Sequence, residues 1–313
     1  MFEIKRYEPS HEQAWNDFVA RSKNGTFLFD RRFMDYHSDR FADSSLMILR
    51  KGRIYALLPA NRVGDTLHSH QGLTYGGLLT DAKATAEGVM EAFGTLNAWL
   101  RNEGVRRVTY KAMPWIYHRL PAEEDLYALT QVCHARLLTR EISSTIPLQQ
   151  PLRFTESRKS GLRKALREGL YMEESGDLAA FWQMLDDNLA SRHHTHPVHS
   201  LDELRLLQGR FPQQIHLYLI YNKEKEPVGG TWAFDTGQVV HTQYIASTEE
   251  GKAYGALDLL FDELINRRYR EGIYLDFGKS TEEGGRVLNE HLIFQKEGFG
   301  GRGVCYDTYE WEP

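Results

Sequence analysis

Hydrophobic residues recur along this chain in two copies of one order of strands and helices. In the first copy, apolar runs at residues 47–50 and 54–59 predict two strands, and a glycine-rich stretch follows at residues 68–77. Residues 82–103 then carry apolar side chains three or four positions apart, which predicts an amphipathic helix. The apolar run at residues 105–110 predicts the strand that ends this copy.

The second copy follows the same order. Apolar runs at residues 215–221, 230–234 and 239–246 predict three strands, and residues 257–270 again show helical spacing. A last strand is predicted at residues 273–277. The repeated order, rather than any single run, indicates that one unit occurs twice.

Both predicted helices end in the same dipeptide. Glu103 and Gly104 close the first helix, and Glu271 and Gly272 close the second. A glycine at this position is typical of a left-handed helix cap. The pair is common by itself, but its recurrence at the same place in both copies supports the duplication.

The predicted fold class is therefore α/β (α+β). We expect two tandem units, each with a mixed, mostly antiparallel sheet flanked by helices. The first unit is predicted to span residues 1–150 and the second residues 151–313, with the final strand a candidate to pack back on the first unit. A chain of 313 residues exceeds the usual size of a single hydrophobic core, which agrees with two units.

Composition narrows the class of protein. No stretch is long and apolar enough to span a bilayer, and the first residues lack the features of a secretory signal. The two cysteines, Cys133 and Cys305, have no metal-ligand spacing, which favours a reduced, cytoplasmic location. A net charge of −5 argues against broad, non-specific nucleic-acid binding, although a local basic patch stays open.

The end of the second copy carries the most informative motif. Residues 294–299 read aromatic-x-Lys-x-Gly-Phe, and they follow a strand, a polar loop and a short helix. This arrangement resembles the last unit of the GNAT N-acyltransferases. The resemblance implies that Phe294 points at the thioester of an acyl donor, and that Gly298 lets the chain turn abruptly into the final strand.

The tandem layout resembles the FemAB family, which appends amino acids to peptidoglycan precursors from aminoacyl-tRNA. The stretches similar to that family lie at residues 15–18, 25–29, 32–36, 157–169, 276–278 and 294–299. The resemblance implies acyl-CoA or aminoacyl-tRNA as the donor substrate, with no metal. It implies an acceptor amine on a small molecule or a peptidoglycan precursor, tRNA as a further candidate partner, and no membrane insertion.

Three places depart from the patterns of these families. Tyr36 and His37 stand where FemAB proteins often carry a lysine for nucleotide phosphates. Residues 250–256 keep glycines and a lysine of the GNAT phosphate loop without its full pattern. Phe294 replaces the tyrosine with which many acetyltransferases protonate the leaving thiolate, and phenylalanine has no proton to donate.

Two stretches are candidates to bind the donor. The segment after residues 239–246 precedes a helix, where unpaired N–H groups and the helix dipole favour a phosphate. The helix at residues 157–169 places cations four apart, which suits an electrostatic grip on a nucleotide, coenzyme A or tRNA. The alternatives are an ordinary surface turn and a solvated helix face. The candidate donor-binding residues are Gly251, Lys252, Gly255, Ala256, Arg163 and Arg167.

Lys296 and Asp276 are the candidates for chemistry in the second unit. A lysine beside the acyl carbonyl stabilises a developing oxyanion, and an aspartate at a strand end orients or deprotonates the amine. The alternative for Lys296 is a solvated cation at a helix C-terminus, where positive charge is favourable. Phe294 and His199 complete the candidate catalytic set.

The histidine-rich segment at residues 193–199 suggests a metal site at first sight. Three of its histidines lie three apart, but Pro197 interrupts any helix that would align them, and no acidic or cysteine ligand stands close by. We expect instead a loop that lines the acceptor cleft, with His194 or His199 as a base near neutral pH.

The glycine-rich stretch of the first copy is a candidate acceptor site. Its glycines predict a backbone that passes close to a ligand or to a neighbouring sheet. An acceptor cleft and simple packing between the units both fit this pattern. The candidate acceptor-binding residues are His70, Tyr75, Gly76, Tyr244 and His194.

These features predict an N-acyltransferase in which a primary amine attacks an activated acyl group directly. Direct transfer agrees with a sequence that has no Gly-x-Ser-x-Gly or Cys/His signature of a covalent nucleophile. One alternative is a binding protein that keeps the GNAT fold without its activity. A more distant alternative is a metal-dependent hydrolase built on residues 193–199.

Overall fold

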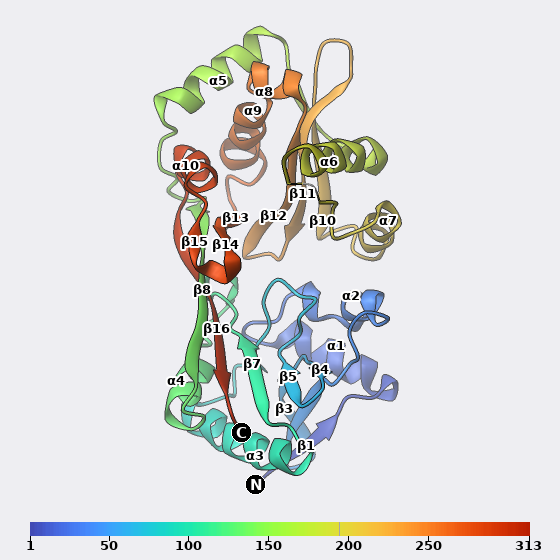
Figure 1. The fold of residues 1–313 in the computed structure, drawn as a ribbon, viewed down its shortest axis with the longest axis vertical. Coiled ribbons are helices and arrows are strands. Elements are labelled where there is room, and N and C mark those ends of the chain that lie inside the picture. The colour runs from blue at the N-terminus through green and yellow to red at the C-terminus, as the bar shows by residue number, and fades with distance from the viewer. Residues whose placement is uncertain (194) are drawn as a thin grey trace. The chain divides into compact units, whose positions relative to one another are not determined.

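The chain folds into two compact units. A computed structural model describes residues 1–193 and 195–313, without the side chains of residues 192 and 193. Unit 1 contains Met1–Ile142, Thr281–Val287 and Cys305–Pro313, and unit 2 contains Ser143–Ser280 and Leu288–Val304. Figure 1 labels the elements of both units. Each unit combines strands with covering helices, which confirms the predicted class of mixed α/β units.

Unit 1 contains two groups of strands. An antiparallel sheet has the order β1-β2-β3-β6, with β1 at Phe2–Arg6, β2 at Leu46–Arg50, β3 at Arg53–Leu58 and β6 at Leu79–Thr80. The second group has the order β4-β5-β7-β16, with β4 at Asn61–Val63, β5 at Thr66–His68, β7 at Arg107–Lys111 and β16 at Arg302–Trp311. In this group β5 and β7 pair in parallel, whereas the β4–β5 and β7–β16 pairs are antiparallel.

The helices of unit 1 cover these strands and connect them. They are η1 at Pro9–His11, α1 at Glu12–Arg21, η2 at Phe27–Phe29, α2 at Arg31–Met34, η3 at Asp35–His37, α3 at Ala86–Asn102, η4 at Trp115–Tyr117 and α4 at Glu124–Gln131. Thr85 caps α3 by accepting a hydrogen bond from the N–H of Gly88. The apolar stripe predicted for this helix is buried, with Val89, Phe93 and Leu96 at most 1% exposed.

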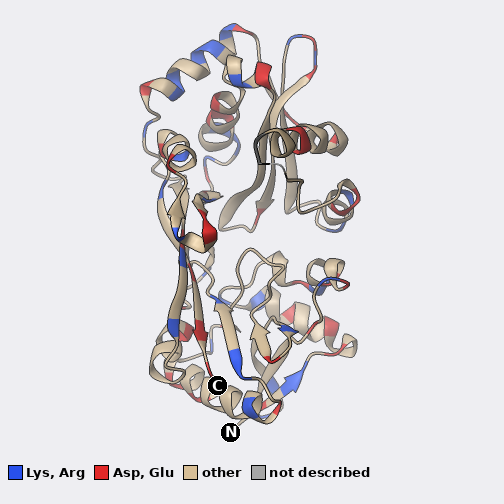
Figure 2. Cartoon of the chain, in the orientation of Figure 1, with Lys and Arg blue, Asp and Glu red and all other residues tan. Residues whose placement is uncertain are grey.

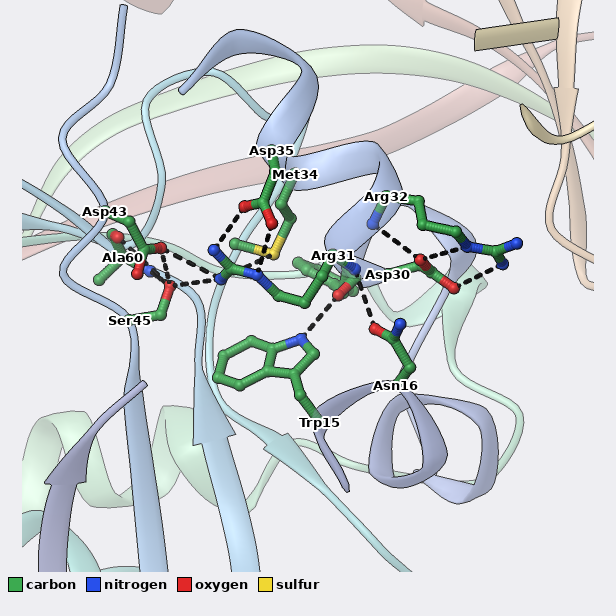
Figure 3. Close-up of polar contacts among 11 residues, drawn as sticks. Trp15, Asn16, Asp30, Arg31, Arg32, Met34, Asp35, Asp43, Ser45 and Ala60 are labelled. Atoms are coloured by element: carbon green, nitrogen blue, oxygen red, sulfur yellow. Dashed lines mark hydrogen bonds and ion pairs between the residues drawn. The ribbon is translucent and has the colours of Figure 1, made fainter. Parts of the chain in front are cut away.

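A buried arginine holds the segment between α1 and β2 in place through hydrogen bonds and ion pairs (Figure 3). Nη2 of Arg31 donates to Oδ1 of Asp35 at 2.5 Å, and Nη1 donates to Oδ1 of Asp43 at 3.1 Å and to Oγ of Ser45 at 3.3 Å. The guanidinium carbon lies 3.8 Å from the ring centre of Tyr7. Two carboxylates and an aromatic face thus compensate the burial of this charge, and the cluster serves the packing of unit 1.

Unit 2 is built on one mixed sheet. Its order is β8-β13-β12-β11-β10-β9, with β8 at Arg136–Pro147, β13 at Tyr274–Lys279, β12 at Val239–Ser247, β11 at Pro227–Asp235, β10 at Ile215–Tyr221 and β9 at Tyr171–Glu174. The β12–β13 pair is parallel and the other pairs are antiparallel. A two-stranded sheet of β14 (Thr281–Glu282) and β15 (Val287–Leu288) flanks the short helix η6 (Glu283–Gly285).

Helices cover both faces of the unit 2 sheet (Figure 1). α6 (Leu178–His193) and α7 (Leu201–Arg210) lie on one face, and α9 (Ala256–Glu263) lies on the other. The remaining helices are α5 at Glu156–Arg167, α8 at Glu249–Tyr254 and α10 at Glu290–Gly298. Among the helices described, none combines the length and the apolar character that a membrane span requires.

Three predicted details of unit 2 are wrong. The helix expected at residues 257–270 is α9 followed by a π-helical segment, η5 at Leu264–Arg268. Gly272 is not a left-handed cap like Gly104, which has φ +69°; a Cβ on Gly272 would lie 2.9 Å from Cδ1 of Leu148, so close packing favours glycine there. Gly298 lies inside α10, and Gly300, with φ +96°, makes the turn instead.

Candidate active site

The cleft of unit 2 begins where two parallel strands separate. β12 and β13 pair at Val239 with Tyr274, at Val240 with Leu275, and last at His241 with Asp276. Beyond that pair, Ile245, Ala246 and Ser247 of β12 and Phe277 of β13 line a cleft of about 550 Å³. The diverging strands therefore present backbone and side chains to a space inside the sheet.

A β-bulge changes the direction of β12 just before the cleft. Trp232 pairs with Tyr244 and Ala233 pairs with Thr242, so Gln243 is the extra residue on β12. Bulges commonly bend a strand and redirect its side chains near functional sites. Here the bulge lies between the last parallel pair and the residues that line the cleft.

The lining of the cleft combines apolar side chains with charged and polar ones. The cations are Arg158, Lys252 and Lys296, and the acidic residue is Asp258. The apolar lining residues are Leu185, Leu189, Ile245, Leu257, Phe261, Phe277, Leu292, Phe294 and Phe299. This composition suits a ligand with an apolar arm and an anionic group.

Arg158 reaches the cleft from α5. Its Nη1 lies 3.1 Å from Oδ1 of Asp258, and its guanidinium carbon lies 5.2 Å from the ring centre of Phe299. Burial raises the pKa of Asp258 to about 6, although Arg158 opposes the rise. Part of the charge of Arg158 is therefore compensated by Asp258.

Lys296 of α10 is buried, and its hydrogen bonds link that helix to the end of β13. Its Nζ donates to the carbonyl oxygens of Gly278 and Lys279 at 2.8 and 3.0 Å, and it lies 2.9 Å from Oγ of Ser280. An ammonium group has three hydrogens, so these contacts engage all of them. Burial lowers the pKa of Lys296 to about 8, against the opposing effect of Asp276.

Asp276 and Phe294 differ sharply in exposure. Asp276 is completely buried and accepts hydrogen bonds from Oγ of Ser143, Oγ1 of Thr145 and Nδ1 of His241 at 2.5, 2.8 and 2.8 Å. Phe294 is 71% exposed and lines the mouth of the cleft. The carboxylate thus lies behind the strand, whereas the aromatic ring lies where a ligand would pass.

The sequence of this part of the chain matches a known family. Residues 155–284 match the model of the acetyltransferase (GNAT) domain. This part of the chain is similar to that domain. The sequence-based resemblance to GNAT acyltransferases is thereby confirmed, and the fold and family support an acyltransferase in general.

Solved structures extend the likeness to the whole chain. FemX superposes with a TM-score of 0.68 at 11% identity, over 99% of this chain and 97% of that chain. L-PGS from Bacillus licheniformis gives 0.62 at 13% identity over 97% and 92%, and a tandem GNAT protein from the clavulanic acid biosynthesis pathway gives 0.53 at 12% over 100% and 98%. At these identities the likeness establishes the fold alone, the tandem arrangement of two mixed α/β units. No curated protein sequence matches the chain.

The predicted phosphate loop of the GNAT domain is largely helical. Lys252 lines the cleft from α8 and pairs with Glu249. The N–H of Gly251 donates to Oγ1 of Thr248 at 3.0 Å, and Gly255, with φ +82°, joins α8 to α9. A Cβ on Gly251 would lie 1.9 Å from the carbonyl oxygen of Val228, so packing requires this glycine. Gly251, Gly255 and the buried Ala256 shape the backbone, and Lys252 supplies the charge.

Arg163 and Arg167 lie exposed on α5 and are not among the residues that line the cleft. Figure 2 shows several Lys and Arg positions, in blue, along this helix. The α5 cation at the cleft is Arg158, which sequence reasoning missed. The helical spacing contained a signal, since Arg158 shares the face of the partly buried Leu162 and the buried Ala165. The exposed pair lies on the opposite, solvated face.

A histidine and a tyrosine pair on the α6–α7 face of the GNAT domain. Nδ1 of His199 lies 2.6 Å from the hydroxyl oxygen of Tyr244, and the indole N–H of Trp182 donates to the carbonyl oxygen of His199 at 3.0 Å. Burial raises the pKa of Tyr244 to about 12, so the phenol stays a proton donor. His194 lies outside the described residues. In the part of the chain that the structure describes, no group of three or more potential ligands could hold a metal.

The candidate acceptor residues of unit 1 are packed inside that unit. Tyr75 is 2% exposed and its hydroxyl lies 3.1 Å from Oγ1 of Thr26. A Cβ on Gly76 would lie 1.9 Å from the carbonyl oxygen of Ser69, and His70 is 3% exposed. The structure therefore brings Lys252, Phe294 and Lys296 together at the cleft, whereas His70, Tyr75 and Gly76 belong to the packing of unit 1.

Proposed function

We propose that the chain transfers an acyl or aminoacyl group from an activated donor in the unit 2 cleft to a primary amine. The observation that carries this proposal is the opening between β12 and β13, lined by apolar and cationic side chains, in the part of the chain that matches the GNAT domain. We assign the donor to unit 2. The acceptor is the amine of a small molecule or of a peptidoglycan precursor.

The transfer is direct. The amine nitrogen bonds to the acyl carbon, and the bond from that carbon to the leaving sulfur or oxygen breaks. Backbone N–H groups beside the bulge of β12 are suited to receive the oxyanion. Because the hydrogens of Lys296 are engaged with residues 278–280, we assign to it a fixed positive charge and the positioning of the strand end.

Two groups are candidates to accept the proton of the amine. One is the buried pair of Asp276 and His241, and the other is the pair of His199 and Tyr244. Asp276 is completely buried, so it acts through its neighbours rather than on the amine itself. Phe294 guides the donor at the mouth of the cleft without taking part in proton transfer.

Titration with acetyl-CoA and with charged tRNA tests the donor. If coenzyme A is the donor, acetyl-CoA binds saturably and Arg158→Met weakens it about 10-fold, because a partly buried cation contacts its phosphates. The matched variant Arg163→Met then leaves its Kd unchanged. If tRNA is the donor, Arg163→Met and Arg167→Met weaken the binding of charged tRNA, and the loss grows at lower salt. Failure of both ligands to bind would refute the proposal.

A GNAT-fold binding protein without activity is the second candidate function. It is favoured by Phe294, which cannot protonate a leaving group, and by a phosphate loop replaced by short helices. A panel of acyl-CoA and aminoacyl-tRNA donors with peptide, sugar and amino-acid amines separates the two. Turnover that Lys296→Ala removes, with the circular dichroism spectrum intact, excludes the binding protein.

A further inference from the structure

The buried corner of Asp276 and His241 has the geometry of an oriented base. Side chains alternate along β13, so Leu275 and Phe277 join the core with α9 whereas Asp276 points to the opposite face. There it meets His241, its partner in the last parallel pair of β12 and β13. The two side chains therefore mark the point at which the strands separate.

The hydrogen bonds at this corner fix the tautomer of His241. The hydroxyls of Ser143 and Thr145 both donate to Oδ1 of Asp276, at 2.5 and 2.8 Å. A carboxylate with these donors is an acceptor, so Nδ1 of His241, 2.8 Å from Oδ2, carries its hydrogen. The basic nitrogen of the neutral imidazole is then Nε2.

The other edge of the ring faces the residue that anchors Lys296. A Cβ placed on Gly278 would lie 3.3 Å from Cε1 and 3.8 Å from Nε2 of His241. The carbonyl oxygen of that glycine accepts from Nζ of Lys296, which lines the cleft. One residue thus separates the imidazole edge from the wall of the cleft, and its missing side chain leaves room there. Asp276 is the charged group in hydrogen-bond contact with the ring.

We propose that His241 is the base that takes the proton from the acceptor amine, and that Asp276 is the positioning residue that holds its tautomer. This inference rests on the proposed acyl transfer. As the nitrogen bonds to the acyl carbon, its proton passes to Nε2. The imidazolium then returns that proton to the thiolate or alkoxide that leaves. One histidine thus acts first as the base and then as the acid, and it supplies the proton that Phe294 cannot donate.

His241→Gln tests the base with little disturbance, because the glutamine amide can still donate to Asp276. With the donor and acceptor that the panel identifies, we expect kcat/KM to fall about 10²–10⁴-fold. Donor Kd stays within twofold. His216→Gln, on strand β10 of the same sheet and paired with Glu174, is the matched control and keeps full activity. His199→Gln tests the competing base.

A second measurement reports on the tautomer without any turnover. In the folded wild type, ¹⁵N spectra of His241 should show a hydrogen on Nδ1 and an unprotonated Nε2. In Asp276→Asn, whose amide can donate to Nδ1, the hydrogen should move to Nε2 and activity should fall as in His241→Gln. Donor binding and circular dichroism confirm that this variant is folded.

The outcomes separate this inference from the proposed function. Wild-type turnover that His241→Gln retains within threefold, or a wild-type hydrogen on Nε2, overturns the role of His241 and leaves acyl transfer standing. Wild-type protein that binds a donor but shows no turnover with any amine overturns both.

Discussion

The two units share a parallel pair of strands, but the chain continues differently beyond the pair in each unit. In unit 1, β5 and β7 pair at Thr66 with Arg107, at Leu67 with Val108 and at His68 with Thr109. In unit 2, β12 and β13 pair over three positions as well. After its pair, β12 continues and the cleft opens beside it, whereas the chain after β5 folds back over the end of β7. The same framework therefore gives a filled space after the parallel pair in unit 1 and an open one after the pair in unit 2.

The filling of unit 1 is held by specific hydrogen bonds. The N–H of Ser69 donates to the carbonyl oxygen of Thr109 at 2.9 Å, and that of Gly76 donates to the carbonyl oxygen of Lys111 at 3.3 Å. Nζ of Lys111 donates to the carbonyl oxygens of His70, Gln71 and Leu73 at 3.4, 3.0 and 2.9 Å. Lys111 thus closes the space after the parallel pair, whereas Lys296 supports the strand beside an open one.

Removal of the two lysines should give the sharpest contrast. Lys296→Met leaves two carbonyl groups without their donor and removes the charge beside the cleft, so we expect kcat to fall about 10²–10³-fold. Lys111→Met should cost unit 1 about 2 kcal/mol of unfolding free energy and leave the donor Kd unchanged. Steady-state kinetics, donor titration and urea unfolding of both variants check this. Equal losses of activity in the two variants would contradict the division of roles.

Filling the cleft of unit 2 should make it resemble unit 1. Leu189 lines the cleft from α6, and Leu189→Trp adds an aromatic ring to that space. We expect donor affinity to fall about 10- to 100-fold, the range that a clash of 1–3 kcal/mol gives. Leu206→Trp, at a 41% exposed position of α7, is the matched control. Isothermal titration would show unchanged affinity in Leu189→Trp if the donor binds elsewhere.

Much of the fold could be predicted because the strands and helices carry clear hydrophobic periods. The strand at residues 215–221 and the helix stripe of Val89, Phe93 and Leu96 lie where the pattern placed them. The period does not distinguish an α-helix from the π-helical segment at Leu264–Arg268, because one added residue per turn barely changes the apolar face. A Glu-Gly pair also does not show whether its glycine is needed for a positive φ or for close packing. Gly104 has a positive φ, whereas Gly272 is closely packed against Leu148.

The candidate site was harder to predict because its contacts join distant segments. Residues 294–299 indicated Lys296, but the contacts of that lysine lie 16 to 18 positions earlier in the chain. Asp276 was expected at an accessible strand end, and its burial depends on β8, more than 130 positions before it. The glycine-rich stretch at residues 68–77 did not distinguish two possibilities. Glycines let a backbone pass close to a ligand, but they equally let it pack against neighbouring protein.

Acid should weaken unit 1 before unit 2. Burial, reinforced by His37 and Lys111, lowers the pKa of His70 to about 3. A folded-state pKa below that of the unfolded chain adds stability above pH 6.5, and this stability is lost as the pH falls toward 3. Between pH 7 and 5 we expect a loss of about 2 kcal/mol from this residue.

Hydrogen exchange of unit 1 peptides at pH 7 and 5 measures that loss. His70→Asn should remove most of the pH dependence, since asparagine tolerates the positive φ of 66°. His134→Asn is the matched control, because His134 also has a positive φ, of 49°, but its side chain is exposed. A pH dependence that persists in His70→Asn would assign the acid sensitivity to other groups, His118 first among them.

The smallest effect concerns the charge that unit 2 keeps in its cleft. The raised pKa of Asp258, about 6, means that folding favours its protonated form, so the buried carboxylate lowers stability above pH 6 and not below 3.8. At pH 7.5, Asp258→Asn should therefore gain about 1 kcal/mol, since a buried amide has a desolvation cost of its own. It should also bind an anionic donor about threefold tighter, because it removes a negative charge beside Arg158. Asp262→Asn, one turn further along α9 and outside the cleft lining, should change neither quantity. Weaker donor binding in Asp258→Asn would mean that the carboxylate orients Arg158 for the donor. Donor binding in the open cleft would then require the ion pair of Arg158 and Asp258.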